Sequence, residues 1–216
     1  MEIYLLMPSN CSQDRFVVDT LRNDIAAPYP SPGIWFIGLA DNQHKNGFWV
    51  ELGCQGPINS SNTHILEESL AWTGLSIDIS QPHIDLWEGV RSTDHLVCGD
   101  ALSLDYEQLF KEHDVPEVVD YLSVDLEPPP ITFTAVQKIP FHKYKFKTIT
   151  FEHDHYREEF LHYNLREDSR KFFDSIGYFK VPDHIADTFS KVSLFKVSFS
   201  EDWYVHPELI DVGIFK

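Results

Sequence analysis

The sequence has no apolar run long enough to cross a membrane. Nowhere in its 216 residues do apolar side chains approach the ~20 consecutive positions that a membrane-spanning helix requires. The first residues, Met1–Pro8, are too few and carry no basic group, so they make a poor secretory signal. We therefore expect a cytoplasmic protein with no membrane partner, and a chain long enough for one domain with a full core.

Basic residues are scarce. The chain has 17 Lys and Arg against 34 Asp and Glu, which gives a formal net charge of −17. A field of this sign repels phosphate backbones, so nucleic acid is a poor candidate partner unless a local basic patch exists. The one basic cluster, His142–Lys147, is typical of a solvated loop that leads into a strand. The alternative is a patch that holds an anionic substrate.

Cysteine is also rare. Cys11, Cys54 and Cys98 lie far apart and form neither a Cys-x-x-Cys pair nor a zinc-binding spacing. An odd count fits reduced thiols in a reducing compartment. The run Glu152–His155 contains side chains that bind metals, but neighbouring residues on a strand point to opposite faces. We therefore predict no metal site.

Strand and helix patterns alternate along most of the chain. A proline-rich break over residues 26–33 precedes this region, so we interpret residues 1–45 as an N-terminal extension packed on the core and residues 46–216 as one domain. Short apolar runs predict strands at Phe48–Leu52, Leu75–Ile79, His95–Cys98, Asp120–Asp125 and Thr148–Phe151. Helices are predicted over Ser61–Trp72, Gln81–Arg91, Leu104–His113, Ile131–Lys138 and Arg157–Ile176, the last closed by Gly177.

The end of the chain has a different pattern. Tyr178–Val181 and Lys191–Phe199 are predicted as two late strands, which favours an antiparallel pair at one edge of the sheet. The tail Glu201–Pro207 is aromatic and acidic, and we expect it to pack back on the body. The alternation before it indicates βαβ units, so the fold class predicted is α/β with a mostly parallel sheet.

Carboxylates or small residues follow each predicted strand, and the carboxyl ends of parallel strands are where α/β proteins bind ligands. The five segments are Glu51–Gly56, Asp78, Gly99–Ala101, Asp125–Glu127 and Glu152–His153. Glycines after the first strand let a ligand approach the backbone. Asp78 can accept two hydrogen bonds from a ribose diol, and Asp100 with Ala101 can hold an adenine. The pattern therefore favours a nucleoside ligand.

A third glycine is missing from the first of these turns. Gly53 and Gly56 fit only part of the Gly-x-Gly-x-x-Gly fingerprint of dinucleotide-binding proteins. S-adenosylmethionine needs no pyrophosphate cradle, and its sulfonium and ammonium cations suit an acidic pocket. The missing glycine thus favours S-adenosylmethionine over a dinucleotide and makes a nucleotide-dependent oxidoreductase the weaker alternative.

Several of these segments resemble the FkbM-type methyltransferase family. The matching segments are Phe48–Cys54, Ser61–Thr63, Leu66–Glu67, Trp72–Leu75, Asp120–Glu127 and Ile149–His153. The resemblance runs from about Ser12 to Tyr178, and Asp120–Glu127 with the Asn62–Thr63 pair is its most specific part. It implies a class I methyltransferase fold of Rossmann-like type, a three-layer αβα sandwich with a seven-stranded, mostly parallel sheet. It also implies S-adenosylmethionine as methyl donor and O-methylation of a sugar, a glycan or another small hydroxyl compound.

Three features depart from the family pattern. Pro128–Pro130 stands where family members often have a glycine, Asp78-Ile79 replaces a common Glu-Pro pair, and Gln55–Pro57 replaces a more usual acidic-glycine pair. Prolines stiffen the loop beside the expected acceptor site. The departures affect the acceptor more than the cofactor, and they leave open a non-catalytic binding module on a methyltransferase scaffold.

The strand-end pattern and the resemblance together predict the cofactor site. Its members are Glu51, Gly53, Cys54, Gly56, Asn62, Thr63, Asp78, Ile79, Asp100, Ala101 and Asp125. For some of them a structural role is the alternative: Glu51 as organiser of the turn, and Asn62 and Thr63 as helix caps.

Three residues are predicted to act in catalysis. Asp125 would lie beside the transferred methyl group, while His153 or Glu127 would remove the acceptor's proton. The alternatives are a hydrogen-bonded histidine at a strand end and a solvated loop acid. Trp203, Tyr204 and His206 either close over the acceptor or, more typically of aromatic tails, pack in the core.

Overall fold

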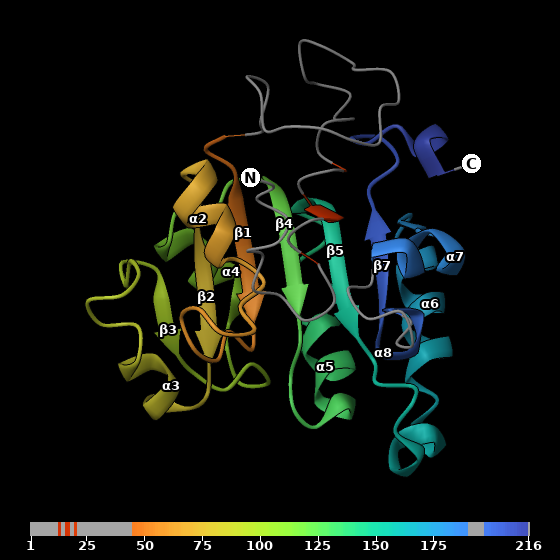
Figure 1. Cartoon of the computed structure of the whole chain (residues 1–216), viewed down its shortest axis with the longest axis horizontal. Helices are drawn as coiled ribbons and strands as arrows, with labels where there is room; N and C mark the ends of the chain where they lie inside the picture. Colours follow the sequence, from red (N-terminus) through yellow and green to blue (C-terminus); the bar gives the residue numbers. More distant parts are fainter. Residues whose placement is uncertain (1–12, 14–15, 18–19, 21–44, 190–196, 216) are drawn as a thin grey trace.

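The framework of the molecule is a seven-stranded sheet with helices on both faces (Figure 1). A computed structural model describes residues 13, 16–17, 20, 45–189 and 197–215. The strand order is β3-β2-β1-β4-β5-β7-β6; β1 to β5 run parallel, and β7 is antiparallel to β5 and β6. The strands are β1 Phe48–Leu52, β2 Thr73–Asp78, β3 Leu96–Cys98, β4 Val118–Val124, β5 Lys145–Glu152, β6 Phe179–Lys180 and β7 Glu201–Val205.

The helices form a layer on each side of the sheet. They are α2 His64–Leu70, α3 Gln81–Asp85, α4 Tyr106–Glu112, α5 Pro129–Val136, α6 Leu165–Ser175, α7 Asp183–Ala186 and α8 Val197–Ser200, with 3₁₀ helices η2 Glu158–Tyr163, η3 Asp187–Phe189 and η4 Val212–Phe215. Alternate strand residues enter two separate cores. Val50 and Leu122 pack in the core that contains α4, α5 and α6. Their neighbours Trp49 and Tyr121 pack in the core that contains α2, α7 and α8. The predicted three-layer αβα sandwich with a seven-stranded, mostly parallel sheet is confirmed.

The long helix predicted over Arg157–Ile176 is wrong in its first half. Residues Glu158–Tyr163 form a 3₁₀ helix, and α6 begins only at Leu165. Asn164 between them has φ 53°, a left-handed conformation that an α-helix cannot contain. Gly177, with φ 85°, closes α6 as predicted. Three other helices are shorter than predicted: α2 spans only His64–Leu70, α3 ends at Asp85, and α4 spans only Tyr106–Glu112.

The last strand lies in a different place from the one predicted. Val197–Ser200 is a helix, whereas residues 191–196 of the predicted strand lie outside the described residues. The strand is β7, Glu201–Val205, in the predicted tail, and every residue of it is buried between β5 and β6. The first two residues of β7 are acids, so the sequence lacks the apolar pattern that identifies a strand buried on both faces. Asp202 is buried because Arg170 of α6 bonds both its carboxylate oxygens, at 2.6 and 2.8 Å.

The predicted N-terminal extension lies mostly outside the described residues. Where the structure describes it, Phe16 and Val17 are buried in the second core, and Phe16 stacks on Trp203 with ring centroids 4.3 Å apart. The Gln13 amide donates to Glu201 at 3.2 Å. The domain boundary at residues 45–46 stays a prediction. In the described part of the chain, every helix is too short or too polar to span a membrane.

Candidate functional site

The sheet has a topological switch point between β1 and β4. The chain leaves β1 towards α2 on one face and leaves β4 towards α5 on the other, as the two cores show. Loops therefore diverge at the carboxyl ends of these strands, the edge to which the arrowheads of β4 and β5 point in Figure 1. In open α/β sheets the crevice at such a point is the usual ligand site.

Gly53 forms the sharp turn at the end of β1. Its φ is 88°, and a Cβ atom there would lie 1.8 Å from the Asp125 carbonyl oxygen. The Gly53 N–H donates to the Ile77 carbonyl at 2.8 Å, and the Asp125 N–H donates to the Leu52 carbonyl at 3.0 Å. The turn is thus held against both neighbouring strands. Only a residue without a side chain fits, which places bare backbone at the switch point.

Asp78, at the end of β2, holds the loop that follows this turn. Its carboxylate accepts hydrogen bonds from the backbone N–H groups of Gln55 and Ser80, each at 2.8 Å, and Nδ1 of His83 lies 3.3 Å away. The side chain is buried. Asp78 therefore lies where a ribose ligand was predicted, but both its oxygens already bind the protein backbone. A carboxylate has about four acceptor sites, so this leaves capacity for a ligand.

Beside Asp78, apolar surface is open to solvent. Ile79 is 71% exposed and Leu86 is 58% exposed. The end of β3 lies next to them, since the Gly99 N–H donates to the Asp78 carbonyl at 2.9 Å. Asp100 there is exposed; hydrogen bonds from Ser103 and from the Leu102 N–H lower its pKa. An exposed apolar side chain flanked by a carboxylate can receive a flat, polar-edged base.

Glu51 lies beneath the turn instead of in the open crevice. Its side chain is fully buried, and Oε2 accepts hydrogen bonds from Thr63 and Ser76, both at 3.0 Å. Burial raises the pKa of Glu51 to about 7, against the lowering effect of the Arg91 cation. The Asn62 amide donates to Ser123 Oγ at 3.1 Å. These side chains tie the start of α2 to three strands.

The raised pKa of Glu51 predicts a pH-dependent stability. A carboxyl group that binds its proton more tightly in the folded state makes the protein less stable as pH rises from its unfolded pKa of 4.5 to its folded value of about 7. Glu51→Gln should remove this decrease in the free energy of unfolding. Above pH 7 the variant should be more stable than wild type by up to about 3 kcal/mol, at roughly 1.4 kcal/mol per pKa unit. Urea unfolding of both proteins at pH 5 and pH 8 measures it. Identical pH dependence in the two proteins would contradict it.

Arg91 is a residue that the sequence reasoning missed. Its buried guanidinium donates to Glu67 Oε2 at 2.5 Å, Ser61 Oγ at 3.0 Å, Thr63 Oγ1 at 3.1 Å and the Pro57 carbonyl at 3.2 Å. It also stacks 4.2 Å above the Trp87 ring. Arg91 thereby holds the loop from Pro57 to the start of α2. An isolated arginine at the end of a predicted helix carries no motif, so no pattern in the sequence indicated this role.

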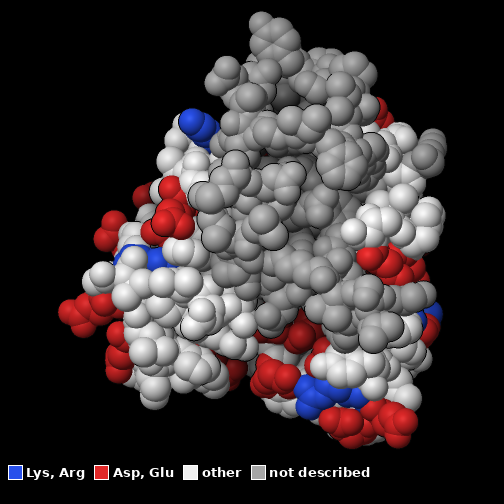
Figure 2. Space-filling model, viewed as in Figure 1, with Lys and Arg blue, Asp and Glu red and all other residues white. Residues whose placement is uncertain are grey.

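Carboxylates from three strands meet beyond the switch point. Asp125 follows β4, Glu152 ends β5, and Glu201 opens β7 as the register partner of Glu152. Burial, the charges of Asp125, Asp154 and Glu201, and a hydrogen bond to Asp125 raise the pKa of Glu152 to about 12. Its Oε2 is buried with no hydrogen-bond partner in the described residues. Figure 2 shows acidic side chains along the same edge of the molecule.

Arg157 compensates the acids at the rim of this group. It contacts Glu127 at 2.7 Å and both Asp154 and Glu159 at 3.1 Å. Glu127 is exposed, and Pro129 and Pro130 after it form the first turn of α5, where a missing N–H costs no hydrogen bond. The prolines therefore begin a helix that was predicted to start at Ile131.

The structure does not bring His153 to this edge of the crevice. Its ring is 1% exposed, Nδ1 accepts from the His155 N–H at 3.1 Å, and Nε2 lies 3.6 Å from Asp202 Oδ2. Asp202 bonds Arg170 of α6, so His153 faces the α6 layer, whereas Ser123 and Glu51 face α2. Burial lowers the pKa of His153. Trp203 and Tyr204 lie in the two cores, and His206 is also buried.

No family model matches the chain, and none of the curated proteins is similar to it in sequence. Among solved structures, a protein described as an rRNA methylase from Clostridium thermocellum is 12% identical, with 77% of this chain and 88% of that chain covered and a TM-score of 0.49. A SAM-dependent methyltransferase from Archaeoglobus fulgidus is 13% identical, with 74% and 84% covered and a TM-score of 0.42. At this level of similarity neither activity transfers to the chain.

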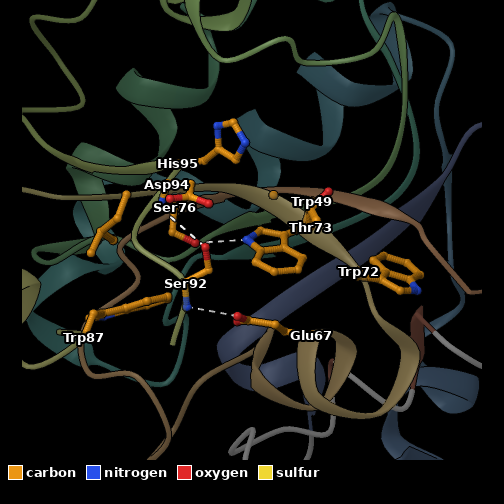
Figure 3. A pocket seen from close by; sticks show the side chains of 11 residues that line it. Trp49, Glu67, Trp72, Thr73, Ser76, Trp87, Ser92, Asp94 and His95 are labelled. Carbon is orange, nitrogen blue, oxygen red and sulfur yellow. Dashed lines mark hydrogen bonds between the residues drawn. The ribbon is translucent and has the colours of Figure 1, made fainter. Parts of the chain in front are cut away.

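A cavity lies away from the switch point. It measures about 110 Å³ and lies where β2 and β3 begin, between the indoles of Trp49, Trp72 and Trp87 (Figure 3). Trp49 Nε1 donates to Ser76 Oγ at 2.9 Å, and this hydroxyl in turn donates to Glu51. The cavity therefore lies below the Glu51 network, not in the crevice. Within the described ranges, the acids, histidines and cysteines form no group that could hold a metal ion.

Proposed function

We propose that the protein is an S-adenosylmethionine-dependent methyltransferase that methylates a hydroxyl group of a sugar or another small molecule. The observation that carries the proposal is the sheet, seven-stranded with an antiparallel β7 between β5 and β6, and with the Gly53 turn at its switch point. The dinucleotide-binding order, 3-2-1-4-5-6, has no such inserted strand. The incomplete glycine fingerprint points the same way.

The residues at the crevice fit this cofactor. Gly53, with Cys54 and Gly56 after it, offers backbone where a side chain would collide with β4. Asp78 and Ile79 lie at the end of β2, where a ribose and the face of an adenine would rest, with Asp100 and Ala101 at the adjoining end of β3. Asp125 and Glu152, whose buried Oε2 has no hydrogen-bond partner among the described residues, suit a cation. When bound, S-adenosylmethionine supplies a methyl group on a positively charged sulfur that leaves readily.

Glu51, Asn62 and Thr63 support this site from below. The hydrogen bonds of their side chains go to other side chains of the framework, so their contribution is to hold the Gly53 turn and the start of α2 in place. Catalysis then depends mainly on holding the acceptor in line with the methyl group, which well-aligned sites achieve by fixing the reactants in near-attack geometry. Asp125 and Glu127 lie on the loop between β4 and α5, beside the position expected for the acceptor.

Calorimetric titration with S-adenosylmethionine and S-adenosylhomocysteine tests the proposal. Binding of both ligands, followed by methyl transfer in a screen of sugars and small hydroxyl compounds, would support it. Failure of both ligands to bind would overturn it. Binding with no transfer to any acceptor would instead favour a binding module on this scaffold.

Asp78→Asn is expected to weaken cofactor binding about tenfold to a hundredfold. The amide keeps the volume but replaces one acceptor oxygen with a donor that faces the Gln55 or Ser80 N–H, and a buried unsatisfied group costs about 1–3 kcal/mol. The loop beside the ribose position should loosen. Asp85→Asn is the matched control, because Asp85 is exposed and bonds only Gln81 among the described residues. Equal affinities for the two variants would refute the role of Asp78.

A further inference from the structure

The cavity between the three indoles has fixed walls. Trp49, Trp72 and Trp87 line it, and we call it the indole cavity (Figure 3). A Cβ atom at Gly74 would lie 2.3 Å from the Trp49 ring. One at Gly47 would lie 2.4 Å from the Trp72 ring, so both indoles rest on bare glycine backbone. Because all three tryptophans are at most 3% exposed, the space between them is built into the fold.

Hydrogen bonds fix two of these rings and use their N–H donors. Trp49 Nε1 donates to Ser76 Oγ at 2.9 Å, and Trp87 Nε1 donates to the Gln55 carbonyl at the same distance. What these two rings can still offer a ligand is their π systems, whose faces are electron-rich. A cation is the kind of ligand that such faces attract.

The ionisable side chains of the lining also favour a cation. Glu67 and Asp94 contribute carboxylates and His95 an imidazole, whereas no Lys or Arg of the described residues lines the cavity. Glu67 is already paired with Arg91. Asp94 is exposed and forms no ion pair within the described part of the chain, so its charge is available to a ligand. An anion would be repelled by both carboxylates.

Two of these rings already hold one cation of the protein. The Arg91 guanidinium lies 4.2 Å from the centroid of Trp87 and 5.5 Å from that of Trp49, within the limit of about 6 Å for a cation–π contact. Arg91 does not itself line the cavity, and Glu67 balances its charge. A second cation, inside the cavity, would have Asp94 to balance it.

We propose that the indole cavity binds a small alkylammonium ion, which contacts the indoles and is balanced by Asp94. The cavity volume of about 110 Å³ sets the size of the ion. An apolar cavity of about 150 Å³ admits benzene, so an ion of about four to six non-hydrogen atoms fits. The cavity lies where β2 and β3 begin, whereas the crevice lies where the strands end. Binding in the cavity is therefore independent of the proposed function.

The indole N–H groups report where a ligand binds. In ¹H–¹⁵N NMR titrations with tetramethylammonium chloride at pH 8, where an ordinary imidazole is neutral, the assigned indole signals of Trp49, Trp72 and Trp87 should shift and saturate. The signal of Trp203, which stacks on Phe16 and does not line the cavity, should not follow the titration. tert-Butanol has nearly the same size and shape but no charge. Its binding should be about tenfold weaker, the ratio that one well-placed cation–π contact provides.

Variants test the part that Asp94 plays. Asp94→Asn removes a charge at an exposed position, so the variant should fold as wild type does. Its affinity for tetramethylammonium should be about threefold lower, because a carboxylate beside the ion is lost. Glu158→Gln is the matched control. It removes one charge from an exposed position of η2, away from the cavity lining, and should bind tetramethylammonium as wild type does.

The possible outcomes differ clearly. Saturable shifts of the three indole signals, a preference for the charged ligand and a loss confined to Asp94→Asn would support the site. Equal affinity for tert-butanol would reveal an apolar cavity without charge recognition and would overturn the inference. Shifts confined to other residues, or no saturable shift at millimolar concentrations, would also overturn it, as would equal affinities of the two variants.

Discussion

Replacing Gly53 with alanine should destabilise the protein by about 3 kcal/mol or more and abolish cofactor binding. A Cβ atom at this position would lie 1.8 Å from the carbonyl oxygen and 2.9 Å from the carbonyl carbon of Asp125. Both are backbone atoms of the adjoining strand end, so no side-chain rotation can relieve the clash. The φ of 88° adds strain of about 1–2 kcal/mol for any residue with a side chain. Urea unfolding and calorimetric titration measure the two losses.

Two other glycines serve as controls for this prediction. Gly89 has φ 71° but no atom within 4 Å of the position of a Cβ, so Gly89→Ala should show the backbone strain alone, about 1 kcal/mol. Gly56 has the same open space without a left-handed φ, and Gly56→Ala should change the free energy of unfolding by less than about 0.5 kcal/mol. If Gly53→Ala is no worse than Gly89→Ala, the turn is not pressed against β4 and the proposed geometry of the crevice is wrong.

The parts of the fold that sequence predicts well are those with a local cause. β1 matches its predicted bounds, and β2 to β5 fall within a few residues of theirs, because a strand buried on both faces is a short apolar run between turns. β7 fails this test. Its first two residues are Glu201 and Asp202, which are buried and bind Gln13 and Arg170, residues distant in sequence. A periodicity argument cannot detect partners that only the folded chain brings together.

In the candidate site, too, the residues that the sequence located correctly are those whose position has a local cause. Gly53, Asp78 and Asp100 lie at or just after the ends of strands, so their position at one edge follows from the parallel sheet. His153 also follows a strand, yet its ring turns to the α6 face, because side chains alternate and Asp202 and Arg170 lie on that side. By the same alternation Glu152, one residue earlier, points to the opposite face of the sheet. The sequence located the strand end but not the face to which each side chain points.

Removal of the Arg91 guanidinium should lower the free energy of unfolding by about 3–5 kcal/mol, because it leaves the buried partners of a charge without that charge. Arg91→Met keeps much of the apolar stem that lies over Trp87 but leaves Glu67, Ser61 and Thr63 without their common donor. It also removes the cation that lowers the pKa of Glu51. Arg157→Met is the matched control. That arginine contacts three acids, two of them exposed, and is itself only partly buried, so screening makes its ion pairs weaker and its loss should be much smaller.

A double variant distinguishes the two reasons for this loss. If Arg91 stabilises the loop partly by compensating Glu51, then Glu51→Gln, which is neutral, should stabilise the Arg91→Met protein more than it stabilises wild type, and the excess should be larger at pH 8 than at pH 5. If Arg91 acts only as a hydrogen-bond donor to the loop between Pro57 and Thr63, the two changes should add at both pH values. Urea unfolding of the four proteins of this cycle decides between them. Additivity at pH 8 would mean that Glu51 is stabilised by Thr63 and Ser76 alone, and that the crevice floor does not depend on the buried cation.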